Sequence, residues 1–113
     1  MIGSREGTSN PIKETLDSTG NSIGIDVSGA ENGFIIQLDY DNGVSPSIVL
    51  SLEVSVDGVG WVPLDTGIYT ITDTDGVAVW DIINTNANFV RIDYEVSSGS
   101  IDAFAVLSAK RRH

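Results

Sequence analysis

The side chains that could perform catalysis are few and poorly placed for it. The single histidine is His113, the last residue, and the chain contains no cysteine. A serine or threonine nucleophile needs a neighbouring base, and a histidine at the end of a chain has no fixed position from which to act. The 16 acidic residues are scattered over turn-forming segments, so their spacing selects no pair for glycoside hydrolysis. We therefore expect a protein that is not an enzyme and that carries no cofactor.

Two acidic segments resemble the start of a calcium-binding loop, namely Asp39–Gly43 and Asp73–Gly76. An EF-hand loop requires a glutamate about six residues after its glycine, and a helix on each side. Ile82 stands at the glutamate position of the second segment, and the flanking residues have the pattern of strands. We therefore interpret both segments as turns and predict no metal site. A calcium site assembled from the oxygen atoms of two loops stays an open alternative.

The larger aromatic side chains could form a platform on which a sugar stacks; they are Tyr40, Trp61, Tyr69, Trp80 and Tyr94. Tyr40 and Tyr94 are in phase with the apolar alternation around them, which predicts that both are core residues. Trp80 is in register with its apolar neighbours, and Trp61 follows a Gly-x-Gly turn, where a ring can close the end of a sandwich. Packing is therefore the preferred interpretation for both tryptophans, and ligand stacking is the alternative.

The charge of the chain is strongly acidic and unevenly distributed. The 113 residues carry a formal net charge of −10, and no lysine or arginine occurs between Glu14 and Val90. Such a body repels nucleic acid, so we expect no nucleic-acid partner. No apolar run approaches the roughly 20 residues of a membrane-spanning helix, and residues 1–10 lack the apolar core of a signal peptide. We therefore expect synthesis in the cytoplasm and no membrane partner.

Alternation of apolar and polar residues predicts β-strands throughout the chain. It is clearest in Ser47–Val56, where every second residue is apolar, and Asp57-Gly58 supplies the turn that reverses this strand. Asp41-Asn42-Gly43 and Ser97–Ser100 are likewise expected to be turns that end strands. About eight strands with turn signals about every 8–12 residues predict an all-β, antiparallel two-sheet sandwich of jelly-roll-like type. The predicted core residues are Ile48, Leu50, Leu52, Val54, Val90, Ile92, Tyr94 and Leu107.

The chain has the length of one domain, which buries about two-thirds of its unfolded surface. Residues 1–13 are rich in glycine, serine, threonine and asparagine, and this composition predicts a flexible N-terminal arm. Residues 14–109 form the predicted sandwich domain. Residues 110–113 form a basic C-terminal tail, which could bind an acidic surface.

One hairpin carries a resemblance to a known class of proteins. Glu53–Leu64 is similar to an S-x-D-G-x-x-W-x-x-L hairpin that is common in β-sandwich proteins of tailed-phage virions, and looser versions occur in carbohydrate-binding sandwiches. Leu16–Gly29 looks like the beginning of such domains, and Phe89–Ile101 looks like their closing hairpin. The resemblance implies a jelly-roll-like capsid decoration or cement protein, which sits as a trimer on the outside of the bacteriophage head.

The function implied by this resemblance is structural. The protein would bridge subunits of the major capsid protein as a homotrimer, and it would reside in the virion after synthesis in the host cytoplasm. The alternative is a carbohydrate-binding module that takes part in host adsorption. The candidates for capsid contacts lie in the arm and the tail: Ile2, Arg5, Pro11, Ile12, Lys13, Lys110, Arg111 and Arg112.

Overall fold

The computed structural model describes residues 8–9, 12–22, 24–28, 33–64, 67–82 and 87–109. The secondary structure of these residues consists of strands, without a helix that could cross a membrane. The strands are β1 (Thr8–Ser9), β2 (Lys13–Leu16), β3 (Gly20–Asn21), β4 (Ile25–Asp26), β5 (Phe34–Ser55), β6 (Val62–Pro63), β7 (Tyr69–Ile71), β8 (Gly76–Ile82) and β9 (Phe89–Ala109).

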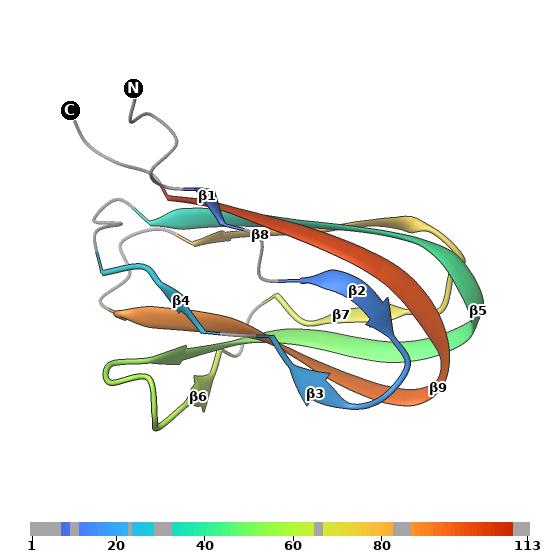
Figure 1. Cartoon of the computed structure of the whole chain (residues 1–113), viewed down its shortest axis with the longest axis horizontal. Coiled ribbons are helices and arrows are strands. Elements are labelled where there is room, and N and C mark those ends of the chain that lie inside the picture. Colours follow the sequence, from blue (N-terminus) through green and yellow to red (C-terminus); the bar gives the residue numbers. More distant parts are fainter. Residues whose placement is uncertain are drawn as a thin grey trace.

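Two long strands organise the molecule. β5 and β9 pair in antiparallel fashion along their whole length, from Phe34 opposite Ala109 to Ser55 opposite Phe89. Both bend in the middle, so that each contributes one half to each of two layers (Figure 1). The upper sheet of Figure 1 contains β8, the first half of β5, the second half of β9, β2 and β1. The lower sheet contains β6, β7, the second half of β5, the first half of β9, β3 and β4. The predicted antiparallel sandwich is confirmed.

The bend replaces two predicted turns. Asp41-Asn42-Gly43 and Ser97–Ser100 were expected to end strands, but the chain continues through both as β5 and β9. The pairing register shifts between Asp41 and Ile48, and positive φ angles occur at Asn42 (54°), Ser45 (44°) and Gly99 (73°). Such irregularities bend a strand sharply and let it pass from one sheet to the other. The two segments are therefore corners of the sandwich.

The core lies between the two sheets and follows the predicted alternation. Every predicted core residue except Val54 is buried, and Val54 packs partly buried against the others. Trp80 is buried, as expected, whereas Tyr40 is only partly buried beside the core. The register is well specified because a shift by one residue would move a whole apolar set to the solvent face.

The sandwich begins earlier in the chain than residue 14. Thr8–Ser9 pairs with β9, and Ile12 is only 2% exposed. The backbone N–H of Ala105 donates to the Ile12 carbonyl oxygen at 2.8 Å. These residues belong to the sandwich rather than to an arm, because the long strand β9 offers them a free edge and a place in the core. Lys13 likewise begins β2 of the sandwich, whereas residues 1–7, 10 and 11 of the expected arm and the tail 110–113 lie outside the described residues.

A tyrosine hydroxyl covers part of the outer edge of β8. Tyr69, from β7 of the lower sheet, donates to the Val79 carbonyl oxygen at 2.5 Å and accepts from the Val79 N–H at 3.4 Å. Its ring meets Trp80 edge to face, with centroids 5.2 Å apart, and the Trp80 indole N–H donates to the Gly67 carbonyl oxygen. The hydroxyl thus occupies backbone groups that an exposed edge would offer to another strand.

Candidate functional site

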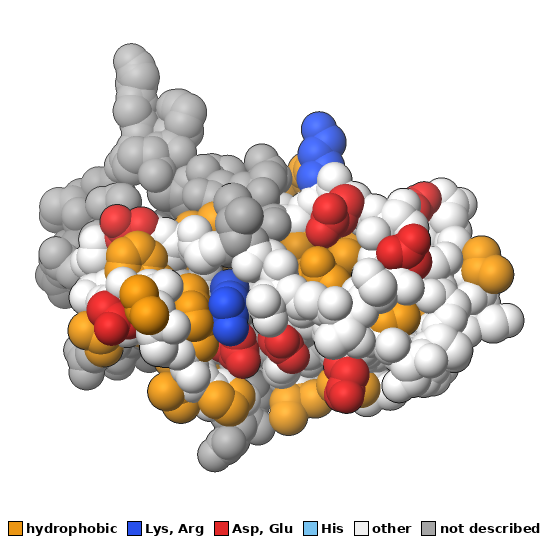
Figure 2. Space-filling model, turned by 60° about the horizontal axis from the view of Figure 1, so that its bottom comes forward, with side chains coloured by type: hydrophobic (Ala, Val, Ile, Leu, Met, Phe, Trp, Pro, Cys, Tyr) orange, Lys and Arg blue, Asp and Glu red, His pale blue; other side chains and the backbone are white. Residues whose placement is uncertain are grey.

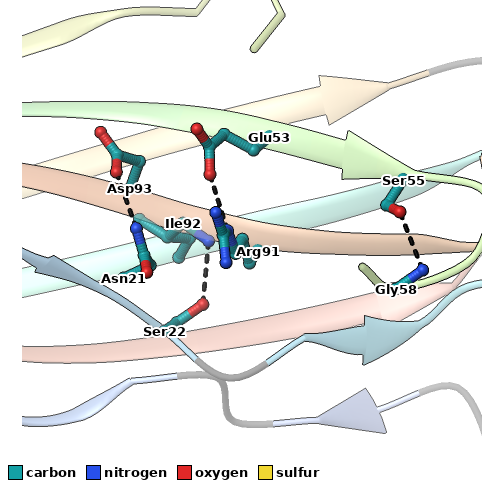
Figure 3. A network of polar contacts seen from close by, with 8 residues as sticks. All are labelled: Asn21, Ser22, Glu53, Ser55, Gly58, Arg91, Ile92 and Asp93. Carbon is teal, nitrogen blue, oxygen red and sulfur yellow. Dashed lines mark hydrogen bonds and ion pairs between the residues drawn. The ribbon is translucent and has the colours of Figure 1, made fainter. Parts of the chain in front are cut away.

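The hairpin between β5 and β6 is held by its own side chains. The Asp57 Oδ1 atom accepts hydrogen bonds from Ser55 Oγ (3.1 Å) and from the backbone N–H groups of Val59 (2.9 Å) and Gly60 (3.0 Å). The Gly58 N–H donates to Ser55 Oγ at 2.8 Å (Figure 3), and Gly58 has a φ of 80°. The bonds from Gly60, Val59 and Ser55 lower the pKa of Asp57. The predicted Asp-Gly turn is therefore confirmed, and its loop is preorganised.

This hairpin folds over the outer face of the lower sheet. A Cβ atom placed on Gly58 would lie 3.6 Å from the ring of Phe89, and one on Gly24 would lie 3.1 Å from the indole of Trp61. The guanidinium carbon of Arg91 lies 4.3 Å from the centroid of the Trp61 ring, at the distance of a cation–π contact. Trp61 is thus partly buried on the surface of the sheet, outside the core cluster.

The arginine beneath this contact is itself fixed. Arg91 Nε donates to Glu53 Oε1 at 2.6 Å (Figure 3), and the two side chains are 23% and 18% exposed. Glu53 and Arg91 lie directly opposite each other on β5 and β9. The ion pair therefore fixes the position of the guanidinium that supports the indole.

The neighbouring row of the same face carries further hydrogen-bonding groups. Asn21 Nδ2 donates to Asp93 Oδ1 at 2.9 Å (Figure 3), and Ser51 is the partner of Asp93 on β5. The backbone N–H of Ile92 donates to Ser22 Oγ at 2.8 Å, which ties β3 to β9. We define the Trp61 shelf as the outward-facing group Asn21, Ser51, Glu53, Trp61, Arg91 and Asp93. It combines one aromatic ring with hydroxyl, amide and carboxylate groups on a rigid sheet.

The space-filling view that brings the bottom of the molecule forward shows hydrophobic side chains gathered at one end and acidic side chains across the middle (Figure 2). The hairpin itself presents apolar side chains to solvent, because Val56, Val59 and Val62 are 72%, 83% and 62% exposed. A pocket with a cavity volume of about 390 Å³ lies beside the hairpin. It is lined by Val54, Ser55, Val56, Asp57, Gly60, Val62 and Ala87.

A second, smaller hollow of about 180 Å³ lies at the corner end of the sandwich. It is lined by Asp39, Tyr40, Asp41, Asp102, Ala103 and Phe104. The two acidic loops of the open calcium alternative do meet near here, since the Gly43 N–H donates to the Thr74 carbonyl oxygen at 2.9 Å. Within the described ranges, however, no group of three or more acidic or histidine side chains could hold a metal ion.

Two of the predicted capsid-contact residues, Ile12 and Lys13, lie in the described part of the chain. Ile12 is buried in the core, so its side chain is not available to a partner. Lys13 is exposed on β2, opposite Phe104. The remaining candidates lie outside the described residues: Ile2, Arg5, Pro11, Lys110, Arg111 and Arg112.

The sequence interpretation missed the Trp61 shelf. Packing was the preferred role for Trp61, but the structure places its ring on the outer face, over Arg91. A signal was present, because Trp61 and Pro63 alternate with Val62, and Pro63 pairs with the outward-facing Glu53. The alternation indicates that Trp61 and Pro63 share one side of the strand, but only the pairing with Glu53 shows that this is the outer side of the sheet.

Comparison with known proteins shows the fold. No protein-family model matches the sequence, and the search of curated proteins found no match. The crystal structure of the SPBc2 prophage-derived protein YomS matches with a TM-score of 0.60 and 12% identity, over 90% of this chain and 91% of that one. The CBM32 of AlyQ, in complex with 4,5-unsaturated mannuronic acid, matches with a TM-score of 0.57 and 13% identity, over 88% and 92%. A CBM4 structure matches with a TM-score of 0.57 and 12% identity, over 81% of this chain and 61% of that one. The protein thus shares a β-sandwich fold with a prophage-derived protein and with carbohydrate-binding modules.

Proposed function

We propose that this protein is a carbohydrate-binding β-sandwich and that it binds sugar at the Trp61 shelf. The observation that carries the proposal is the partly exposed indole of Trp61, fixed over Arg91 beside hydrogen-bonding side chains. A sugar ring has apolar C–H faces and a rim of hydroxyl groups. An aromatic ring can stack on the C–H face, and the side chains of Asn21, Ser51 and Asp93 can form hydrogen bonds with the hydroxyl groups.

The rigidity of the shelf also supports a binding role. The Glu53–Arg91 ion pair fixes the guanidinium on which the indole packs, and the hydrogen bonds to Asp57 fix the hairpin that carries Trp61. A ligand would therefore meet side chains that are already ordered, which reduces the entropy lost on binding. Carbohydrate-binding modules among the structures with a similar fold add support. In this proposal the protein holds a glycan without cleaving it.

The test removes the aromatic ring and leaves the sandwich intact. Trp61→Ala should weaken glycan binding by at least tenfold, about 1.4 kcal/mol, because the stacking surface is lost. The matched control is Phe104→Ala, which removes another exposed aromatic ring, 41% exposed, from the upper sheet. Binding is measured on a glycan array and then by calorimetry with the retained glycan, and melting temperatures confirm that both variants fold. Unchanged binding by the Trp61 variant, or equal loss in the Phe104 variant, would contradict the proposal.

A structural virion protein is the second candidate. The observation in its favour is the likeness to the prophage-derived protein YomS, which extends over nine-tenths of both chains. In this case the protein would bind the major capsid protein on the outer surface of a phage head, as a trimer. Purified protein is mixed with undecorated heads, and saturable binding in multiples of the shell symmetry, with delayed thermal rupture, would support it. Failure to bind heads, together with retention on the glycan array, would decide for carbohydrate binding.

A further inference from the structure

The charges of the Trp61 shelf restrict which glycans it can hold. Three carboxylates point outward from this part of the lower sheet: Glu53 on β5, and Asp93 and Glu95 on β9. Arg91 is the basic residue among them, and its Nε atom is already bound to Glu53 at 2.6 Å. In the described ranges the other basic residue is Lys13, which lies on β2 of the upper sheet. The shelf thus keeps a net negative charge within a protein whose formal charge is −10.

These carboxylates are suited to neutral sugars. An ionised carboxylate has about four acceptor sites on its two oxygens. Asp93 uses one of them for Asn21, so it can also accept hydrogen bonds from sugar hydroxyl groups. A carboxylate on the ligand has no proton to donate at neutral pH, and at the same position it would meet Asp93 and Glu95 as a like charge.

We infer that the Trp61 shelf selects neutral glycans and rejects glycans that carry carboxylates, such as polyuronates. The inference rests on the proposed carbohydrate-binding function and specifies its ligand class. It also separates this protein from the AlyQ module of similar fold, whose solved complex contains an acidic sugar. A carboxylate held a few ångströms from Asp93 should weaken binding about tenfold or more, given the interaction of two unit charges at a protein surface.

The experiment compares glycans that differ only in oxidation at the C6 atom. The probes are β-1,4-mannohexaose with the β-1,4-mannuronate hexamer, and cellohexaose with its C6-oxidised counterpart. A glycan array with neutral and acidic members extends the comparison to other sugar configurations. For each bound pair, calorimetry gives the dissociation constants at low and at high sodium chloride. At low salt the neutral member should bind more tightly, by about tenfold or more. At high salt the ratio of the two dissociation constants should fall, because ions screen the repulsion.

Two variants separate local repulsion from the overall charge. Asp93→Asn keeps an oxygen acceptor for Asn21 but removes the carboxylate, so it should reduce the difference in affinity between neutral and acidic probes. Asp75→Asn also removes one negative charge, from the exposed turn before β8 on a different part of the molecule, and should leave this difference in affinity unchanged.

Equal or tighter binding of the acidic member at low salt would overturn the inference. An equal effect of Asp75→Asn would also overturn it, because the selectivity would then belong to the net charge and not to the shelf. Retention of no glycan on the array would instead refute the proposed function on which the inference rests.

Discussion

Replacement of the glycine at the corner of the sandwich by alanine should destabilise the fold, although alanine adds only one methyl group. Gly99 lies in the segment of β9 that crosses the bend, and its φ is +73°. A Cβ atom placed there would lie 2.3 Å from the carbonyl oxygens of both Val44 and Ser45 on β5. These are backbone atoms, so no side-chain rotation can relieve the overlap. Gly99→Ala must therefore separate the two long strands at the corner or change the backbone angle.

The magnitude follows from two contributions. A left-handed backbone conformation costs a non-glycine residue about 1–2 kcal/mol. Separation of the strands weakens ladder hydrogen bonds near the Val44–Ser100 and Ser47–Ser98 pairs, each with a net contribution of about 1 kcal/mol. The expected loss is therefore about 2–4 kcal/mol of unfolding free energy. For a domain of this size that corresponds to a fall in melting temperature of about 8–16 °C.

The assay is thermal and urea unfolding of the variant beside a matched control. Gly60→Ala makes the same chemical change in the hairpin, where no heavy atom lies within 4 Å of the added Cβ. This control should stay within about 0.5 kcal/mol of the wild type. If the Gly99 and Gly60 variants melt at the same temperature, the close contact at the corner does not stabilise the sandwich and the reasoning fails.

Two further changes test the edge and the hairpin. Tyr69→Phe removes the hydroxyl that bonds the backbone groups of Val79, so it should lower the free energy of unfolding by about 0.5–1.5 kcal/mol, as measured by urea unfolding. It should also increase concentration-dependent self-association, as measured by light scattering, because the edge of β8 is then exposed. A variant with the stability and the self-association of the wild type would show that the edge needs no such cover. Backbone hydrogen bonds from Gly60 and Val59 lower the pKa of Asp57 from its usual 3.8, so its stabilisation is complete above about pH 4 and is lost as the pH falls through the lowered pKa. Asp57→Asn keeps an acceptor without a titrating group, so its melting temperature should lie below that of the wild type at neutral pH and approach it in acid; a constant difference across the pH range would contradict the assignment.

The alternation of side chains determined most of the fold. Because strands have a period of two, the apolar positions of Ile48–Leu52 and Val90–Tyr94 identify the buried faces without knowledge of their partners. The Asp57-Gly58 turn is also local, since its hydrogen bonds and its positive φ involve residues within one hairpin. The side on which Trp61 lies was not predicted, because it follows from the pairing of Pro63 with Glu53 across the sheet. To this extent the sandwich and the hairpin that carries the candidate site could be predicted.

The tertiary structure alone decided how these strands are joined and what they carry. Asn42 and Gly99 adopt positive φ angles that suit a tight turn and a corner equally well, so local signals could not show that β5 and β9 continue from one sheet to the other. The burial of Ile12 depends on the pairing of the residues on both sides of it with β9, which exists only after the sheets assemble. The Trp61 shelf likewise depends on Arg91 from another strand, held by its ion pair with Glu53 across the sheet. Contacts between distant segments of the chain leave no periodic trace in the sequence, and for this reason the site emerged only when the sheet was assembled.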